Sequence, residues 1–338
     1  MNRLLQIREV VKAFYEKYSR FIVPVGRFLL SLILYLTIFY HTGYNVRFTK
    51  PIFAVGLALI TAFLPMTGVP VIMCLLVLAE FLSLSLEVTV VTMLLLTLML
   101  LLYFVFRPGK SFLMALAVLF CLWKIPLALL PAALLISPIE ALTVAFGILI
   151  YGLVAVVKKD VALFSSSSTL TMTGKINQLL SDLFSSEKLM LILLSVTMAM
   201  ILISMIKKQK MNHAHLVGMI SGDLLYLMIV VIGDLLIGIE INLPNLLAGL
   251  AVNILMSLII VYLFINMDYR HTEIVEFEDD EYYYYVKAVP KMRVTAPKKT
   301  LETIRDEEDE EEPEEAEDTF SEDDLFIHRV FSDEEEEA

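Results

Sequence analysis

LVGMISGDLLYLMIVVIGDLLIG, residues 216–238, is a long apolar run that carries two aspartates. At 1.5 Å per residue, a helix of this length crosses a bilayer. Gly-Asp-Leu-Leu occurs in it twice, and the spacing of 11 residues is close to three helical turns, so Asp223 and Asp234 share one helix face. A carboxylate in hydrocarbon costs about 2.5–3.5 kcal/mol, so we expect this face to meet protein or water.

Two interpretations of the aspartates stay open. They line a substrate or ion path, or Asp223 bonds a neighbouring helix while Asp234 lies near the headgroups. Glu80 and Lys124 also fall inside apolar segments, and ionisable groups at such positions are candidates for function. Lys124 is the cation deep enough to pair with Glu80 or Asp223, as a translocation site or as a lock between helices.

The composition of the whole chain agrees with a membrane protein. Of 338 residues, 58% are hydrophobic, and the mean hydropathy is +0.76. The net charge of −12 is unevenly distributed, because residues 267–338 hold 27 acids and 8 Lys or Arg. We predict an all-α polytopic membrane protein with eight or nine transmembrane segments, at residues 24–40, 52–66, 70–86, 88–106, 112–136, 139–157, 189–206, 216–238 and 246–266.

Segment 112–136 is interrupted by Trp-Lys-Ile-Pro at residues 123–126, with Pro131 further on. Proline removes a backbone donor, so Pro126 and Pro131 are expected to break the helix. One interpretation is a re-entrant hairpin that lines a cavity, and the other is a kinked span whose Lys124 reaches towards the headgroups. A re-entrant hairpin leaves eight crossings and an inside C-terminal tail, whereas nine crossings place the tail outside.

The chain divides into four predicted regions. Residues 1–22 form an amphipathic helix, and the six Lys and Arg residues up to Arg27 place the N-terminus in the cytoplasm. Residues 23–266 are the transmembrane domain. Residues 267–297 hold two short strands around an Asp279-Asp280 turn, which form a small β-hairpin-like module. Residues 298–338 are a disordered acidic tail, which we place in the cytoplasm.

Near its end the tail carries a cluster of large apolar residues in otherwise acidic sequence. Such a cluster is typical of a short motif that folds on a protein partner. The partner-binding residues that we predict are Leu325, Phe326, Ile327, Val330 and Phe331.

The sequence Phe-Glu-Asp-Asp-Glu-Tyr-Tyr-Tyr-Tyr-Val-Lys-Ala-Val-Pro-Lys, residues 277–291, supports a family resemblance. With the membrane block before it, it resembles a family of uncharacterised multi-pass membrane proteins of anaerobic Gram-positive bacteria, often labelled permease-like. The resemblance implies a bacterial cytoplasmic membrane and transfers no activity.

No nucleophile elbow, phosphate loop or HExxH motif occurs, so we predict neither an enzyme nor a cofactor, a metal site or nucleic-acid binding. The predicted partners are the lipid bilayer and a protein bound by the tail. The interrupted segment and the two aspartates favour a transporter- or permease-like core. The alternative is a non-catalytic scaffold whose acidic tail recruits cell-envelope or division machinery.

Overall fold

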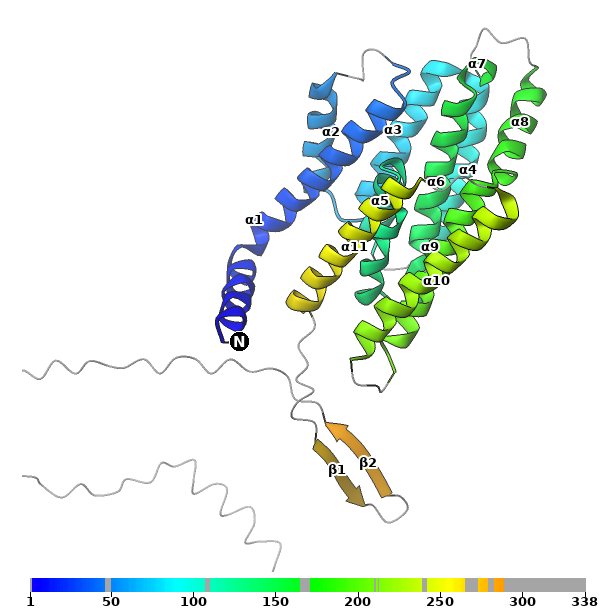
Figure 1. Cartoon of the computed structure of the whole chain (residues 1–338). Helices are drawn as coiled ribbons and strands as arrows, with labels where there is room; N and C mark the ends of the chain where they lie inside the picture. The colour runs from blue at the N-terminus through cyan, green and yellow to red at the C-terminus, as the bar shows by residue number, and fades with distance from the viewer. Residues whose placement is uncertain are drawn as a thin grey trace, which may run out of the picture. The chain divides into compact units, whose positions relative to one another are not determined.

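The computed structural model is built from helices, apart from one pair of strands (Figure 1). The residues that it describes are 2–45, 50–106, 110–164, 171–209, 211, 213–238, 242–264, 273–278 and 283–288. The helices are α1 (Asn2–His41), α2 (Pro51–Phe63), α3 (Gly68–Leu84), α4 (Leu86–Phe106), α5 (Phe112–Leu122), α6 (Ala141–Lys159), α7 (Val161–Phe164), α8 (Met172–Phe184), α9 (Glu187–Ile206), α10 (Ala214–Ile237) and α11 (Leu243–Phe264). Two 3₁₀ segments, η1 (Pro126–Leu134) and η2 (Pro138–Glu140), join α5 to α6.

Six helices in the described part of the chain are long and apolar enough to cross a membrane. They cover Ala13–His41, Leu86–Val105, Pro138–Lys159, Glu187–Ile206, Ala214–Ile237 and Leu243–Leu263. The eight or nine expected spans included three segments that form shorter helices, namely α2, α3 and α5. Pro65 is the second residue after α2, and Pro126 is the fourth residue after α5, so neither helix can continue past its proline without losing a backbone hydrogen bond.

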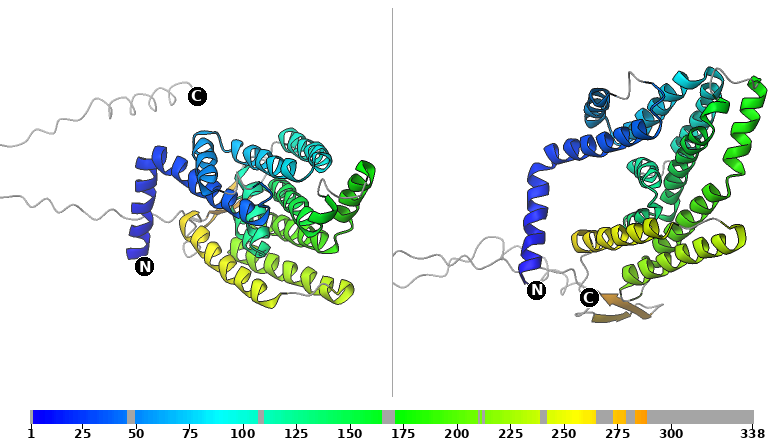
Figure 2. Two further views of the ribbon diagram at one scale, coloured as in Figure 1. Left: turned by 90° about the horizontal axis from the view of Figure 1, so that it is seen from above. Right: turned by 45° about the horizontal axis from the view of Figure 1, so that its top comes forward.

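The expected N-terminal helix and the first span are one continuous helix, α1, rather than two elements. Figure 2 shows that α1 is bent along its length, and Pro24 lies inside it. Arg27 Nη1 then donates to the carbonyl of Leu64, 2.7 Å away, which fastens α1 to the end of α2. Tyr35 and Thr61, whose hydroxyls are 3.2 Å apart, join the same two helices again.

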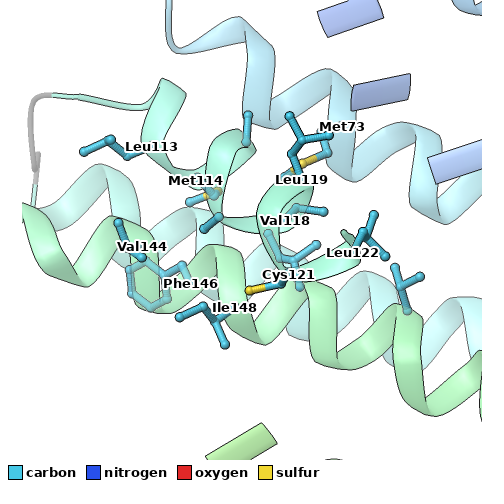
Figure 3. Packing of buried hydrophobic residues seen from close by; sticks show 14 of the residues in the cluster. Met73, Leu113, Met114, Val118, Leu119, Cys121, Leu122, Val144, Phe146 and Ile148 are labelled. Carbon is cyan, nitrogen blue, oxygen red and sulfur yellow. The ribbon is translucent and has the colours of Figure 1, made fainter. Parts of the chain in front are cut away.

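The buried core is centred on α5 and α6. Eight of the eleven residues of α5 are buried, and Figure 3 shows its apolar side chains, from Leu113 to Leu122, against Val144, Phe146 and Ile148 of α6. At Gly147 of α6 the two helices are so close that an added Cβ would lie 2.5 Å from the carbonyl oxygen of Met114. The body of this short helix is therefore surrounded by protein, while Trp123 directly after it is exposed.

The strands β1 (Glu273–Glu278) and β2 (Tyr283–Ala288) pair antiparallel, with Glu278 opposite Tyr283. The other residues of the predicted 267–297 module lie outside the described part of the chain. How this module docks stays a prediction.

Candidate functional site

The predicted break in segment 112–136 takes the form of a helix end followed by a turn. The N–H of Ile125 donates to the carbonyl of Phe120 at 2.9 Å, and the N–H of Lys124 donates to the carbonyl of Cys121 at 3.0 Å. These two bonds make a Schellman motif, which closes a helix when the residue after its cap adopts the left-handed conformation. We call residues 123–125 the tip.

Lys124 is that left-handed residue, with φ of +60°. Glycine usually fills the position, because a side chain there costs about 1–2 kcal/mol. Strained residues of this kind gather at functional sites, where the side chain is needed in that place. The ammonium group of Lys124 is therefore a candidate for a functional role at the tip.

A cavity of about 190 Å³ lies beside the tip, between α5, α6, α9, α10 and α11. Both apolar and polar side chains line it. The lining residues are Cys121, Lys124, Ile125, Pro126, Leu127, Tyr151, Lys188, Leu191, Ile192, Tyr226, Val230, Asn242, Asn245 and Leu246. A second cavity, of about 220 Å³, shares Tyr151, Lys188 and Ile192 with the first and adds Lys159 and Asp182.

Among the described residues that line the first cavity, the two charged ones are lysines. Lys124 and Lys188 are both exposed, and neither forms an ion pair with any residue in the described part of the chain. Tyr226 is only 4% exposed and has no hydrogen-bond partner among those residues. α11 begins at the cavity wall, where the side chain of Asn242 accepts from the N–H of Asn245 at 3.3 Å.

The opposite end of segment 112–136, which we call the base, is made differently. Lys207, directly after α9, donates from Nζ to the carbonyls of Ala133 at 2.9 Å and Leu134 at 3.0 Å, and also to that of Ile136. Lys110 donates to the carbonyl of Leu135. Four successive carbonyls are thus satisfied by two ammonium groups. Burial, and then the charges of Lys110 and Lys208, lower the pKa of Lys207 to about 8, while Glu140 acts in the opposite direction.

Asp223 lies outside the lining of the cavity. Its Oδ1 accepts from Nδ2 of Asn253, a fully buried residue of α11, at 2.8 Å. The glycine next to it explains the repeat seen in the sequence, since a Cβ at Gly222 would lie 2.3 Å from Ile203 and a Cβ at Gly233 would lie 2.4 Å from Leu191. The small residues let α10 approach α9 closely.

The other two predicted carboxylates are also separate from the tip. Asp234 is partly buried in the last turn of α10. Glu80 is fully buried, and its Oε2 accepts from the N–H of Tyr44 at 2.9 Å, which holds the loop after α1. Lys124 makes no ion pair with Glu80 or Asp223. Of the predicted site residues, the cavity brings together Lys124 and Pro126, while Pro131 is buried inside η1.

Several residues of the site were not singled out in the sequence. They are Lys188, Tyr151, Tyr226, Asn242 and Asn245, together with Lys110 and Lys207 at the base. A lysine at either end of an apolar segment is an ordinary topogenic signal, so no local pattern distinguishes Lys188 from Lys208. The predicted tail residues Leu325, Phe326, Ile327, Val330 and Phe331 lie outside the described residues.

No family model, curated protein or solved structure matches the chain. Among the described residues, no group of three or more His, Cys, Asp or Glu side chains is placed to hold a metal ion.

Proposed function

We propose that the chain is a transporter- or permease-like membrane protein whose substrate site is the cavity at the tip. The observation that carries the proposal is the enclosed, broken segment 112–136, whose strained end meets a cavity with polar groups from four other helices. Broken helices inside a membrane block are typical of transporters, because their free backbone ends and polar side chains face a substrate rather than lipid.

The proposed topology follows from contacts at two ends of the helix bundle. His41 and Lys158, whose nitrogen atoms are 3.1 Å apart, mark one end, together with the Tyr44–Glu80 bond. The base marks the other end. The α2–α3 pair begins after His41 and ends near Glu80, which is at the same end of the bundle. Whether or not α2 and α3 cross the membrane, the chain is therefore on the same side before α2 and after α3.

Segment 112–136 likewise enters at Lys110 and returns at Leu135. This favours the re-entrant interpretation. With an even number of crossings, residues 267–338 would lie on the side of the N-terminus, and the basic residues of α1 favour the cytoplasm for that side. The number is six if α2 and α3 stop short and eight if both cross, so nine crossings are disfavoured.

The side of the tail can be measured with Ser321→Cys in a background that lacks Cys74 and Cys121. We expect a membrane-impermeant thiol reagent to label it only after the cells are permeabilised. Labelling in intact cells would place the tail outside and remove the re-entrant hairpin from the proposal.

Transport itself is tested by access to the cavity. A Leu191→Cys variant in the same background should be labelled by the impermeant reagent in right-side-out vesicles and also in inside-out vesicles, because a transport site opens to both sides in turn. Labelling from one side only would contradict transport. The scaffold alternative rests on the acidic tail, and deletion of residues 321–338 would then release a protein partner in a pull-down.

A further inference from the structure

The cavity at the tip has the features of an anion site. Lys124 and Lys188 bring two ammonium groups to its wall, and none of the described residues that line it is an aspartate or a glutamate. The acid of the neighbouring cavity, Asp182, accepts two hydrogen bonds from Nε2 of Gln178, at 3.0 and 2.9 Å. Positive charge next to a low-dielectric wall attracts an anion more strongly than the same charge in open water.

Neutral donors complete the site. The hydroxyl of Tyr226 belongs to a side chain that is 4% exposed and bonds no described residue, so a ligand in the cavity would give it a partner. α11 begins beside Asn242 and Asn245, so the positive end of its helix dipole lies at the cavity wall. These groups favour a bound oxyanion.

The left-handed backbone of Lys124 supports the same inference. A glycine would close the same Schellman motif without strain, yet the chain places a cation there. The lysines at the base differ from those at the tip. Lys110 and Lys207 donate hydrogen bonds to backbone carbonyls, whereas Lys124 and Lys188 line the cavity.

We infer that the cavity at the tip binds a small anion through a carboxylate or phosphate group, held by Lys124 and Lys188, with Tyr226 as a neutral donor. This inference rests on the proposed function, because it names the substrate class of the same site. The volume of about 190 Å³ is below the usual range for drug-sized ligands, roughly 300–1,000 Å³, which limits the ligand to a small molecule or to one headgroup.

The test is equilibrium binding of labelled succinate and labelled inorganic phosphate to the full chain in phosphatidylcholine nanodiscs. Trp123, the single tryptophan, is 46% exposed and adjacent to Lys124, so its fluorescence gives a second readout of binding. We expect saturable binding of at least one probe, with an affinity that falls by about tenfold or more in Lys124→Asn and in Lys188→Gln. Asparagine tolerates the left-handed backbone, so Lys124→Asn removes the charge without adding strain.

Lys208→Gln is the matched control, since it removes the same charge from an exposed position at the other end of α9, roughly 30 Å away. Its affinity should equal that of the unchanged chain. Tyr226→Phe should weaken binding less than loss of either lysine. Phosphatidylglycerol in the nanodiscs separates the two sources of the anion: competition with the probes identifies a lipid headgroup, and no competition identifies a water-soluble ligand.

The inference is overturned if neither probe binds saturably and phosphatidylglycerol changes nothing, or if Lys124→Asn and Lys188→Gln bind as the control does. The two proposals fail separately. Anion binding with one-sided access of Leu191→Cys would refute transport and keep the anion site. Two-sided access of Leu191→Cys without anion binding would keep the transport proposal and refute the anion site.

Discussion

The base and the tip of segment 112–136 each place lysines at the end of a half-length helix, but they use them in opposite ways. At the base, Lys110 and Lys207 donate to the four carbonyls of residues 133–136. At the tip, Lys124 occupies a strained backbone position and lines a cavity with Lys188. A lysine satisfied by protein carbonyls stabilises the fold, whereas one without a protein partner is available to a ligand.

The largest effect on stability is expected at the base. Lys207→Met keeps much of the side-chain length but leaves three carbonyls without a donor, which should lower the free energy of unfolding by about 2–3 kcal/mol. Unfolding in a titration with denaturing detergent measures the loss. Lys208→Met is the control and should change stability by no more than about 0.5 kcal/mol. If the two variants lowered stability equally, Lys207 would contribute only its charge, and its hydrogen bonds to the carbonyls would add no stability.

The contact between α5 and α6 positions both the base and the tip of segment 112–136, and Gly147→Ala tests it. Its Cβ would meet the carbonyl oxygen of Met114 at 2.5 Å, a backbone atom that cannot rotate away, so we expect a loss of about 1–3 kcal/mol. Gly56→Ala is the matched control, because open space surrounds its Cβ and alanine favours helix. The same detergent titration compares them. A neutral Gly147→Ala would show that α5 is held less tightly than its burial indicates.

At the tip, Lys124→Gly should separate stability from binding. Relief of the left-handed strain should raise the free energy of unfolding by about 1 kcal/mol relative to Lys124→Ala, which keeps the strain and also lacks the charge. Both variants should lose anion affinity to a similar extent. If glycine were no more stable than alanine, the strain at Lys124 would be absent, and the argument from its backbone would fall.

The smallest effect is expected at Asp223, the carboxylate that the sequence analysis considered as a partner for Lys124. Asp223→Asn retains an oxygen that can accept from Asn253, so abundance and anion binding should both be unchanged. Asp223→Ala loses that bond, at about 0.6 kcal/mol by the average for such bonds in membranes. Abundance in the membrane and flux into proteoliposomes are the measurements. Loss of flux in Asp223→Asn at normal abundance would instead favour the aspartate path considered from the sequence.

Much of the architecture follows from local sequence. Apolar runs predict the six long helices, but the same criterion also predicted spans where α2, α3 and α5 form shorter helices. The Lys-Ile-Pro order at residues 124–126 predicts the break, since a proline after a helix end prevents its continuation. The Gly-Asp-Leu-Leu repeat was noticed for its aspartates. The tertiary structure shows that its glycines carry the contact with α9, while Asp223 and Asp234 have different surroundings.

What the sequence by itself determined is the membrane character of the chain, the place of its broken segment and the strong division of charge between its two regions. Which lysines are satisfied and which face a cavity was decided only by the tertiary structure. Lys207 and Ala133 are 74 residues apart, and Asn253 and Asp223 are 30 apart. Hydropathy and helical periodicity describe neighbours within a few turns, so they carry no information on such pairs. The packing of α5, α6, α9, α10 and α11 brings the polar groups of the cavity together.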